Sequence, residues 1–443
     1  MSKRILNKIL VAVSALSVSV SAMAQSYGSY TPYSIFGVGD MAQPGTAYNR
    51  SMGGVGIATR NNHFINIVNP AAVTARDTLA LMMDFSLYLD NKMFRQNDMT
   101  SASNTANIGA CVVSFPIWKS SAMAVGIMPY SSTGYGYYFN YANPEIIGKT
   151  GNISYSATGQ GAMYQLFAAA GVTFWKRLSL GAEAIYYFGQ TNKDFFETFS
   201  NTSYNAVKNG FDMSLNALSG KFGLQYEQSI GKKSTLCAGA TYTLGTNIHG
   251  FVEEYRYASG AAAVDTLYHK IDTLANNPGR VSLAGELGVG VSYRYADKFS
   301  VELNYTRSDW TSSGFSNVPG FKVNSTPSSS AAWFSTGISE AFRLGMEYTP
   351  NRNDVRYYLR RVSYRAGAYY KKDYFKINGH DIISVGLTLG ATFPIFRWYN
   401  GLTVGMEIGQ RGSMQDSLVK ENYVNFTLGV NMFDIWFQKP KYD

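Results

Sequence analysis

The sequence lacks long hydrophobic runs. Beyond residue 24, no segment offers the roughly eighteen uncharged apolar residues that a membrane-spanning helix needs. No cysteine follows Ala24 directly, so a lipoprotein anchor is not expected. If the chain spans a membrane, it must do so as a closed β-barrel, because in lipid only helices and barrels satisfy every backbone polar group.

Catalytic and metal-binding motifs are also missing. The sequence has no GxSxG elbow and no HExxH pair, and the glycine cluster at 53–56 lacks the strand, helix and downstream acid of a dinucleotide site. We therefore expect no enzyme, no cofactor and no metal, although a lipase built on a barrel wall would be conceivable. The scattered histidines, which we expect in loops or in a plug, are His63, His249, His269 and His380.

The charge balance is only moderately basic. The formal net charge of +9 falls to +6 once Lys3, Arg4 and Lys8 are removed with the leader. The surplus would suit phosphate-bearing lipid head groups at the outer surface, or an ordinary solvated surface. It is too small and scattered to indicate nucleic-acid binding.

Residues 1–24 have the three parts of a secretory signal peptide. A basic start precedes an apolar run from Ile9 to about Val20, and Ala22-Met23-Ala24 supplies small residues before Gln25. We expect cleavage after Ala24 and export of the mature chain.

The mature chain shows a strong period of two. In residues 178–188, Leu178, Leu180 and the following even positions are apolar, whereas Ser179, Gly181 and Glu183 share the other face. A soluble sandwich also alternates in this way. Connections that are short, then long, then short again favour a transmembrane barrel, as does the 15% aromatic content, which suits aromatic girdles at two interfaces.

We predict an all-β transmembrane antiparallel barrel of about fourteen strands over 79–438, with a periplasmic tail at 439–443. Twelve or sixteen strands stay open as alternatives. Tight turns are expected near 118–120, 176–177, 231–234 and 296–297, and long extracellular loops at 131–161, 191–210, 247–279 and 311–333. The predicted strand starts are 79, 105, 121, 162, 178, 211, 234, 280, 298, 334, 361, 378, 400 and 420.

On this strand count, Cys111 and Cys237 lie on the second and seventh strands. A disulfide requires Cα atoms within about 7 Å. We expect two unpaired, inert thiols.

Residues 25–78 lack this alternation and predict an N-terminal hatch, or plug, inside the lumen. Glycines allow close backbone approach, and a proline after an asparagine forces an extended or turn geometry. A barrel of this width leaves a space that wall side chains alone do not fill. The expected hatch residues are Gly53, Gly54, Gly56, Asn69, Pro70 and Ala71.

Within the barrel, Pro129 is the most informative position. Proline removes a ladder hydrogen bond, so it predicts either a strand end at the rim or a kink that opens a gap in the wall. Three acids, Glu183, Glu302 and Glu407, fall on the small and polar face of their strands. We expect them to point into the lumen and to bind the hatch or neighbouring Lys and Arg.

These features resemble the FadL/TodX family of outer-membrane transporters for hydrophobic compounds. The resemblance lies in residues 52–58, in the NPA motif at 69–72 and in residues 125–130, and is weaker in the barrel segments 217–220, 239–242 and 278–310. It implies a fourteen-strand barrel, an N-terminal hatch and a lateral opening at the kinked third strand. The start at 33–37 and the end at Trp436-Phe437 look like the version found in Bacteroidetes, whose relatives include a component of a protein-secretion system.

We therefore expect a channel in the outer membrane of a Gram-negative bacterium for passive uptake of hydrophobic small molecules similar to long-chain fatty acids. Expected partners are that ligand, outer-membrane lipid and lipopolysaccharide. The alternative is a barrel scaffold of a protein-secretion or surface-attachment system, which would bind a protein through the long extracellular loops.

Overall fold

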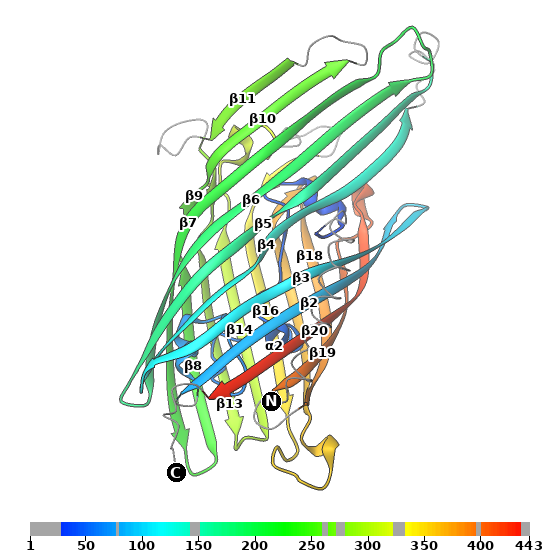
Figure 1. The fold of residues 1–443 in the computed structure, drawn as a ribbon. Coiled ribbons are helices and arrows are strands. Elements are labelled where there is room, and N and C mark those ends of the chain that lie inside the picture. Colours follow the sequence, from blue (N-terminus) through cyan, green and yellow to red (C-terminus); the bar gives the residue numbers. More distant parts are fainter. Residues whose placement is uncertain are drawn as a thin grey trace, which may run out of the picture.

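A computed structural model describes residues 28–76, 79–141, 151–258, 265–271, 280–321, 333–395 and 400–435. Neighbouring strands run antiparallel around a ring, and the first strand, β2, pairs with the last, β20, from Ala80↔Ile435 to Arg95↔Lys420. Within the described residues this closes a barrel of fourteen strands, as predicted (Figure 1). The barrel strands are β2 (Ala80–Gln96), β3 (Met99–Trp118), β4 (Ser121–Tyr141), β5 (Ile153–Phe174), β6 (Leu178–Phe199), β7 (Val207–Ile230), β8 (Ser234–Thr243), β13 (Glu286–Tyr295), β14 (Phe299–Asp309), β16 (Ile338–Tyr348), β17 (Ser363–Ile377), β18 (His380–Pro394), β19 (Gly401–Arg411) and β20 (Lys420–Ile435).

Shorter strands extend this wall or lie inside it. The hairpin of β10 (His249–Ala258) and β11 (Asp265–Ile271) continues the sheet on β7 beyond the end of β8 (Figure 1). The two-residue strand β1 (Asp40–Met41) pairs with β4. The others are β9 (Thr246–Asn247), paired with β12 (Ser282–Leu283), and β15 (Phe334–Thr336), paired with β17.

The alternating sequence pattern separates the two faces of the wall. In β6, Leu180, Ala182 and Tyr186 are exposed on the outside, while Ser179 and Glu183 are buried in the lumen. Because the period of a strand is two, one choice of register fixes the direction of every side chain. The outside of the barrel is therefore apolar and the inside small or polar.

The two ends of the barrel differ. Turns of two or three residues join β3 to β4, β5 to β6, β7 to β8 and β13 to β14, as predicted. The long loops predicted at 131–161 and 191–210 are partly wrong, because β4 runs to Tyr141, β6 to Phe199 and β7 from Val207. Ladder hydrogen bonds continue through Asn-, Ser- and Tyr-rich sequence, which needs no apolar face outside lipid.

The N-terminal segment, residues 28–76, lies within the ring of strands (Figure 1). Its regular elements are η1 (Pro32–Ile35), β1, α2 (Ala47–Arg50) and η2 (Pro70–Thr74). The helix α2 packs on β2, β19 and β20, and η2 packs on β5, β6 and β7. The segment thus contacts opposite parts of the wall.

Among the described residues, no helix is long and apolar enough to cross a membrane. Both cysteines are free thiols, Cys111 on the exposed face of β3 and Cys237 buried in β8. The leader at 1–24, the tail at 439–443 and the Trp436-Phe437 motif lie outside the described residues.

Candidate functional site

A cavity of about 210 Å³ lies inside the barrel, on the long-strand side of the N-terminal segment. Its floor includes Gly54, Ile57 and Val68 of that segment. Apolar and aromatic side chains of the wall share the lining with charged ones. These lining residues include Met128, Pro129, Tyr130, Ile185, Tyr187, Trp310 and Tyr374, together with Glu183, Lys221, Glu286, Arg343 and Lys371.

Beside this cavity, the wall is incomplete. Strand β3 pairs with β4 only between Cys111↔Ile127 and Trp118↔Ser121. Between Met99 and Ala110, β3 pairs with β2 but not with β4, although every residue of both strands is described. The two strands therefore separate beyond Cys111 and Ile127 (Figure 1), and the β4 residues that follow Ile127 line the cavity.

Pro129 lies where this separation begins. The register of β4 against β5 shifts between Pro129↔Tyr164 and Ser131↔Met163, which makes Tyr130 the extra residue of a β-bulge. The strand does not end there but continues to Tyr141. Proline has no N–H to donate to a ladder, and a bulge is one of the places where a strand accommodates it.

The first described residues close the separation from the lumen side. On β4, the Gly134 carbonyl accepts from the Thr31 N–H at 2.7 Å, and the Tyr130 carbonyl accepts from the Ala42 N–H at 2.9 Å. On β3, the Asn107 side-chain amide donates to the Gly28 carbonyl. Residues 28–42 therefore bridge two strand edges that do not reach each other.

The predicted hatch glycines fix the segment to two strands of the wall, β18 and β14. Gly53 has φ +72° and donates its N–H to Thr388 Oγ1 at 2.8 Å, while Gly56 donates to Glu302 Oε1 at 3.1 Å. Gly54, with φ +79°, donates to the Asn49 carbonyl and lines the cavity. A positive φ strains residues that carry a β-carbon, which explains glycine at 53 and 54.

Asn69, Pro70 and Ala71 form the start of η2. The Asn69 side-chain oxygen accepts from the Ala71 N–H at 3.0 Å, which caps the turn, and Pro70 occupies the first position, where no N–H is needed. The Asn69 amide nitrogen donates to the Ile57 carbonyl at 2.7 Å and to Leu224 of β7 at 3.2 Å. The Asn69 side chain thus joins the cap of η2, the loop that follows the glycine cluster, and the wall.

Two of the three lumenal acids bind the N-terminal segment, and the third lines the cavity. Glu302 accepts from the N–H groups of Gly56 and Ala58, and Glu407 accepts from Gln43 Nε2 at 2.6 Å, so both bind the N-terminal segment as expected. Glu183 lies opposite Lys221 on the neighbouring strand and lines the cavity instead.

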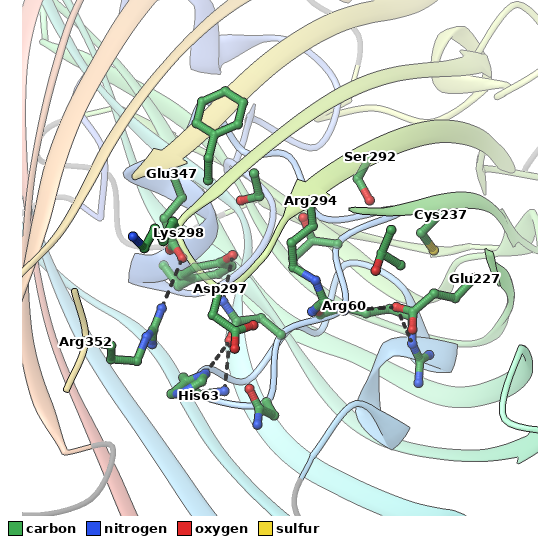
Figure 2. Close-up of a pocket in the computed structure, with 17 residues that line it drawn as sticks. Arg60, His63, Glu227, Cys237, Ser292, Arg294, Asp297, Lys298, Glu347 and Arg352 are labelled. Atoms are coloured by element: carbon green, nitrogen blue, oxygen red, sulfur yellow. Dashed lines mark hydrogen bonds and ion pairs between the residues drawn. The ribbon is translucent and has the colours of Figure 1, made fainter. Parts of the chain in front are cut away.

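On the short-turn side of the segment, a polar pocket of about 40 Å³ holds ion pairs (Figure 2). Glu227 lies 3.8 Å from Arg60 Nε and 3.5 Å from Arg294 Nη2, and Arg294 also donates to the Arg60 carbonyl at 2.8 Å. Burial lowers the pKa of His63 to about 3, with help from nearby arginines, so its ring is neutral. The volume suits a few water molecules, and the charged lining closes this end of the lumen.

Sequence analysis missed the specific role of the lumenal glycines of the strands. A β-carbon at Gly239 would lie 2.2 Å from the Ile57 carbonyl oxygen, and one at Gly181 would lie 2.3 Å from the Pro70 carbonyl carbon. The segment therefore rests directly on wall backbone. Glycines at inward positions of neighbouring strands could have indicated a close backbone contact. The sequence alone does not show which residues they contact.

Two buried clusters within the segment were also missed. Asn49 Nδ2 donates to the Val55 carbonyl at 2.8 Å, and Asn66 Nδ2 donates to the Gly56 carbonyl at 2.6 Å, which holds the glycine loop in place. The Arg365 guanidinium lies 4.5 Å from the rings of both Tyr48 and Phe64.

Among the residues that the structure describes, no group of three side chains could hold a metal ion.

The geometry defines a class: a fourteen-strand barrel with its leading segment folded inside and a separation between its second and third strands. Solved structures of this fold include the toluene transporter TodX of Pseudomonas putida, with TM-score 0.55 and 14% identity over 90% of this chain and 100% of that one. TbuX, the toluene transporter of Ralstonia pickettii, has TM-score 0.54 and 14% identity over 88% and 98%. A FadL homologue of Pseudomonas aeruginosa has TM-score 0.55 and 10% identity over 90% and 100%.

The family model named BamG matches residues 1–443, and the chain therefore belongs to the BamG family. A comparison with curated protein sequences gave no significant match.

Proposed function

We propose that the protein is a channel in the outer membrane of a Gram-negative bacterium for passive uptake of hydrophobic small molecules similar to long-chain fatty acids. The observation that carries the proposal is the cavity of about 210 Å³ that reaches Pro129 on β4, where β4 separates from β3. Moving apolar ligand surface from water into an enclosed apolar site is favourable by about 25 cal/mol per Å².

The route runs through the wall rather than along the barrel axis. Towards the periplasm, an apolar solute would have to displace the half-buried ion pairs of Glu227 with Arg60 and Arg294, which line a pocket of only about 40 Å³. At the wall, residues 28–42 would have to leave the edge of β4, which breaks the backbone hydrogen bonds of Thr31 and Ala42 and the ion pair of Asp40 with Arg411. In this proposal Gly53, Gly54, Gly56, Asn69, Pro70 and Ala71 hold the hatch, and Pro129 marks the lateral opening.

The charges of the cavity favour an amphipathic ligand over a plain hydrocarbon. Lys221, Arg343 and Lys371 line it together with two acids, Glu183 and Glu286. A carboxylate head group would find cationic donors among these lining residues, and its alkyl chain would lie along Met128, Ile185 and Tyr187. This supports a fatty-acid-like ligand.

Uptake of labelled fatty acid tests the proposal in a deletion strain. The strain is complemented with the wild-type gene, with Lys221→Gln, and with Arg256→Gln, which changes an exposed arginine of β10 away from the cavity. We expect the wild type and Arg256→Gln to restore uptake and Lys221→Gln to reduce it. Equal uptake with and without the gene contradicts the channel.

A second candidate is a scaffold that binds a protein partner in secretion or surface attachment. Strands β4 to β7 have 21 to 24 residues, and β10 and β11 continue the sheet further. About ten residues suffice to cross a bilayer, so this surplus builds a large surface outside it. A stoichiometric partner that co-purifies with the wild type but not with a variant lacking residues 249–271 would favour the scaffold, while a lipid bound in the cavity would favour transport.

A further inference from the structure

The connection between β16 and β17 is an exception at the short-turn end. It comprises residues 349–362, whereas the other connections at this end have two to six residues. It includes the short helix η4 (Tyr358–Arg360) and projects beyond the barrel at the bottom of Figure 1. We call residues 349–362 the arginine loop.

The arginine loop is folded by its own hydrogen bonds. Asp354 Oδ1 accepts from the backbone N–H groups of Tyr357 and Arg356, both at 2.8 Å, and the Arg360 carbonyl accepts from the Asn351 N–H at 2.8 Å. The bonds from Tyr357 and Arg356, together with Arg360 at 3.4 Å, lower the pKa of Asp354. Asp354, the only acid of the arginine loop, is therefore ionised and occupied by groups of the loop itself. The loop keeps a net positive charge because it has more arginines than acids.

Three arginines stack on two tyrosines of the arginine loop. The guanidinium carbons of Arg360 and Arg356 lie 4.7 and 5.3 Å from the ring centre of Tyr357, and that of Arg361 lies 5.0 Å from Tyr358. A guanidinium placed over an aromatic ring keeps its N–H edges available for a phosphate.

The loop reaches the lipid-facing side of the barrel. Tyr364, which points outward from β17, donates its hydroxyl to the Leu359 carbonyl at 3.1 Å, and Tyr358 donates to the Pro394 carbonyl of β18 at 3.0 Å. Val355 is 99% exposed and Leu359 is 66% exposed. Outward tyrosines at a barrel end lie at the level of the lipid head groups.

We propose that residues 355–361 bind the phosphate head group of a phospholipid in the leaflet at the short-turn end of the barrel. Arg356, Arg360 and Arg361 contact the phosphate, and Val355 and Leu359 enter the boundary between head groups and acyl chains. The proposal requires only that the barrel spans a membrane, so it stands apart from the transport proposal.

The test uses the full-length protein in a non-ionic detergent. Native mass spectrometry measures binding of added phosphatidylglycerol to the wild type and to a variant that combines Arg356→Gln, Arg360→Gln and Arg361→Gln. We expect binding to weaken at least about tenfold, since each basic residue near a lipid surface contributes measurably. The matched control, Lys232→Gln with Lys233→Gln, changes two exposed cations in the β7–β8 turn and should bind as the wild type does.

A second variant, Val355→Ser with Leu359→Ser, keeps the arginines and should also bind phosphatidylglycerol more weakly. Unchanged binding in the arginine variant, or an equal loss in the lysine control, overturns the proposal. Competition by millimolar inorganic phosphate also overturns it, because the site would then be a simple anion site. Binding of an acidic protein that phosphatidylglycerol does not displace would replace the lipid with a protein partner.

Discussion

The side-chain oxygen of Asn69 lies 2.0 Å from the place that a β-carbon at position 223 would occupy. Gly223 belongs to β7, and Asn69 caps η2 while it binds the Ile57 carbonyl. Asn69 cannot move away from Gly223 without losing its bonds to the Ile57 carbonyl and the Ala71 N–H. The N-terminal segment and the wall are therefore fitted to each other at backbone distance.

Gly223→Ala should loosen the segment while the barrel stays closed. The new methyl group must displace Asn69, at a cost of about 1–3 kcal/mol as for other overpacked cores. Limited proteolysis of the folded protein should cut within residues 28–76 faster than in the wild type. Gly220→Ala on the same strand is the control, because its β-carbon would meet Leu244 at an ordinary 3.5 Å. Equal protection in both variants would show that the fit at Gly223 is not tight.

Arg411→Gln should strongly destabilise the fold. Arg411 lies 2.7 Å from Asp373 and 2.9 Å from Asp40, so its loss leaves these two carboxylates with only Lys371, at 3.2 Å, and Lys92, at 3.7 Å. Breaking a buried ion pair costs about 3–5 kcal/mol. The temperature at which the barrel unfolds on heating in detergent should fall, and adding Asp373→Asn should recover part of the loss. Arg256→Gln on the surface should leave this temperature unchanged, and a similar drop there would contradict the assignment.

The contact of Asp40 with Arg411 should withstand acid. Burial alone would raise the pKa of Asp40, but Arg411 and Lys92 outweigh it and lower the pKa to about 2. Because this pKa is below the unfolded value of 3.8, the pair contributes its full stability above pH 3.8 and loses it as the pH falls through about 2. Hydrogen exchange at residues 38–42 should be equally protected, after correction for intrinsic rates, at pH 7 and pH 5. Increased opening at pH 5 would argue against the pair.

A disulfide between residues 41 and 131 should lock the proposed lateral route. Met41 and Ser131 are paired neighbours of β1 and β4, and antiparallel partners lie about 4.5–5.5 Å apart between Cα atoms, within disulfide range. The double variant Met41→Cys with Ser131→Cys is made in a background where Cys111 and Cys237 are serine. Uptake should stop under oxidising conditions and return after reduction. The serine background alone should not respond to oxidant, and full uptake with the disulfide formed would exclude displacement of residues 28–42.

Alternation along the strands made the barrel predictable, because lipid outside and small residues inside impose a period of two. It failed at the long-strand end: residues 191–210 were expected to form a loop, yet β6 continues to Phe199, paired with β5 and β7. The contacts of the hatch motif were out of reach for another reason. Asn69 and its partner Leu224 are 155 residues apart, and no local pattern reports such a pair.

The helix α2 packs on both β2 and β20, the two strands that meet where the ring closes. Ala47 lies against Gly429 of β20, and the Arg50 guanidinium lies 3.5 Å from the ring centre of Tyr88 of β2. The residues that precede all barrel strands in the sequence thus gain their final neighbours only when the last strand is in place. During biogenesis, α2 can therefore reach its final position only after β20 has paired with β2. Once in place, it contacts both strands and connects them from inside the barrel.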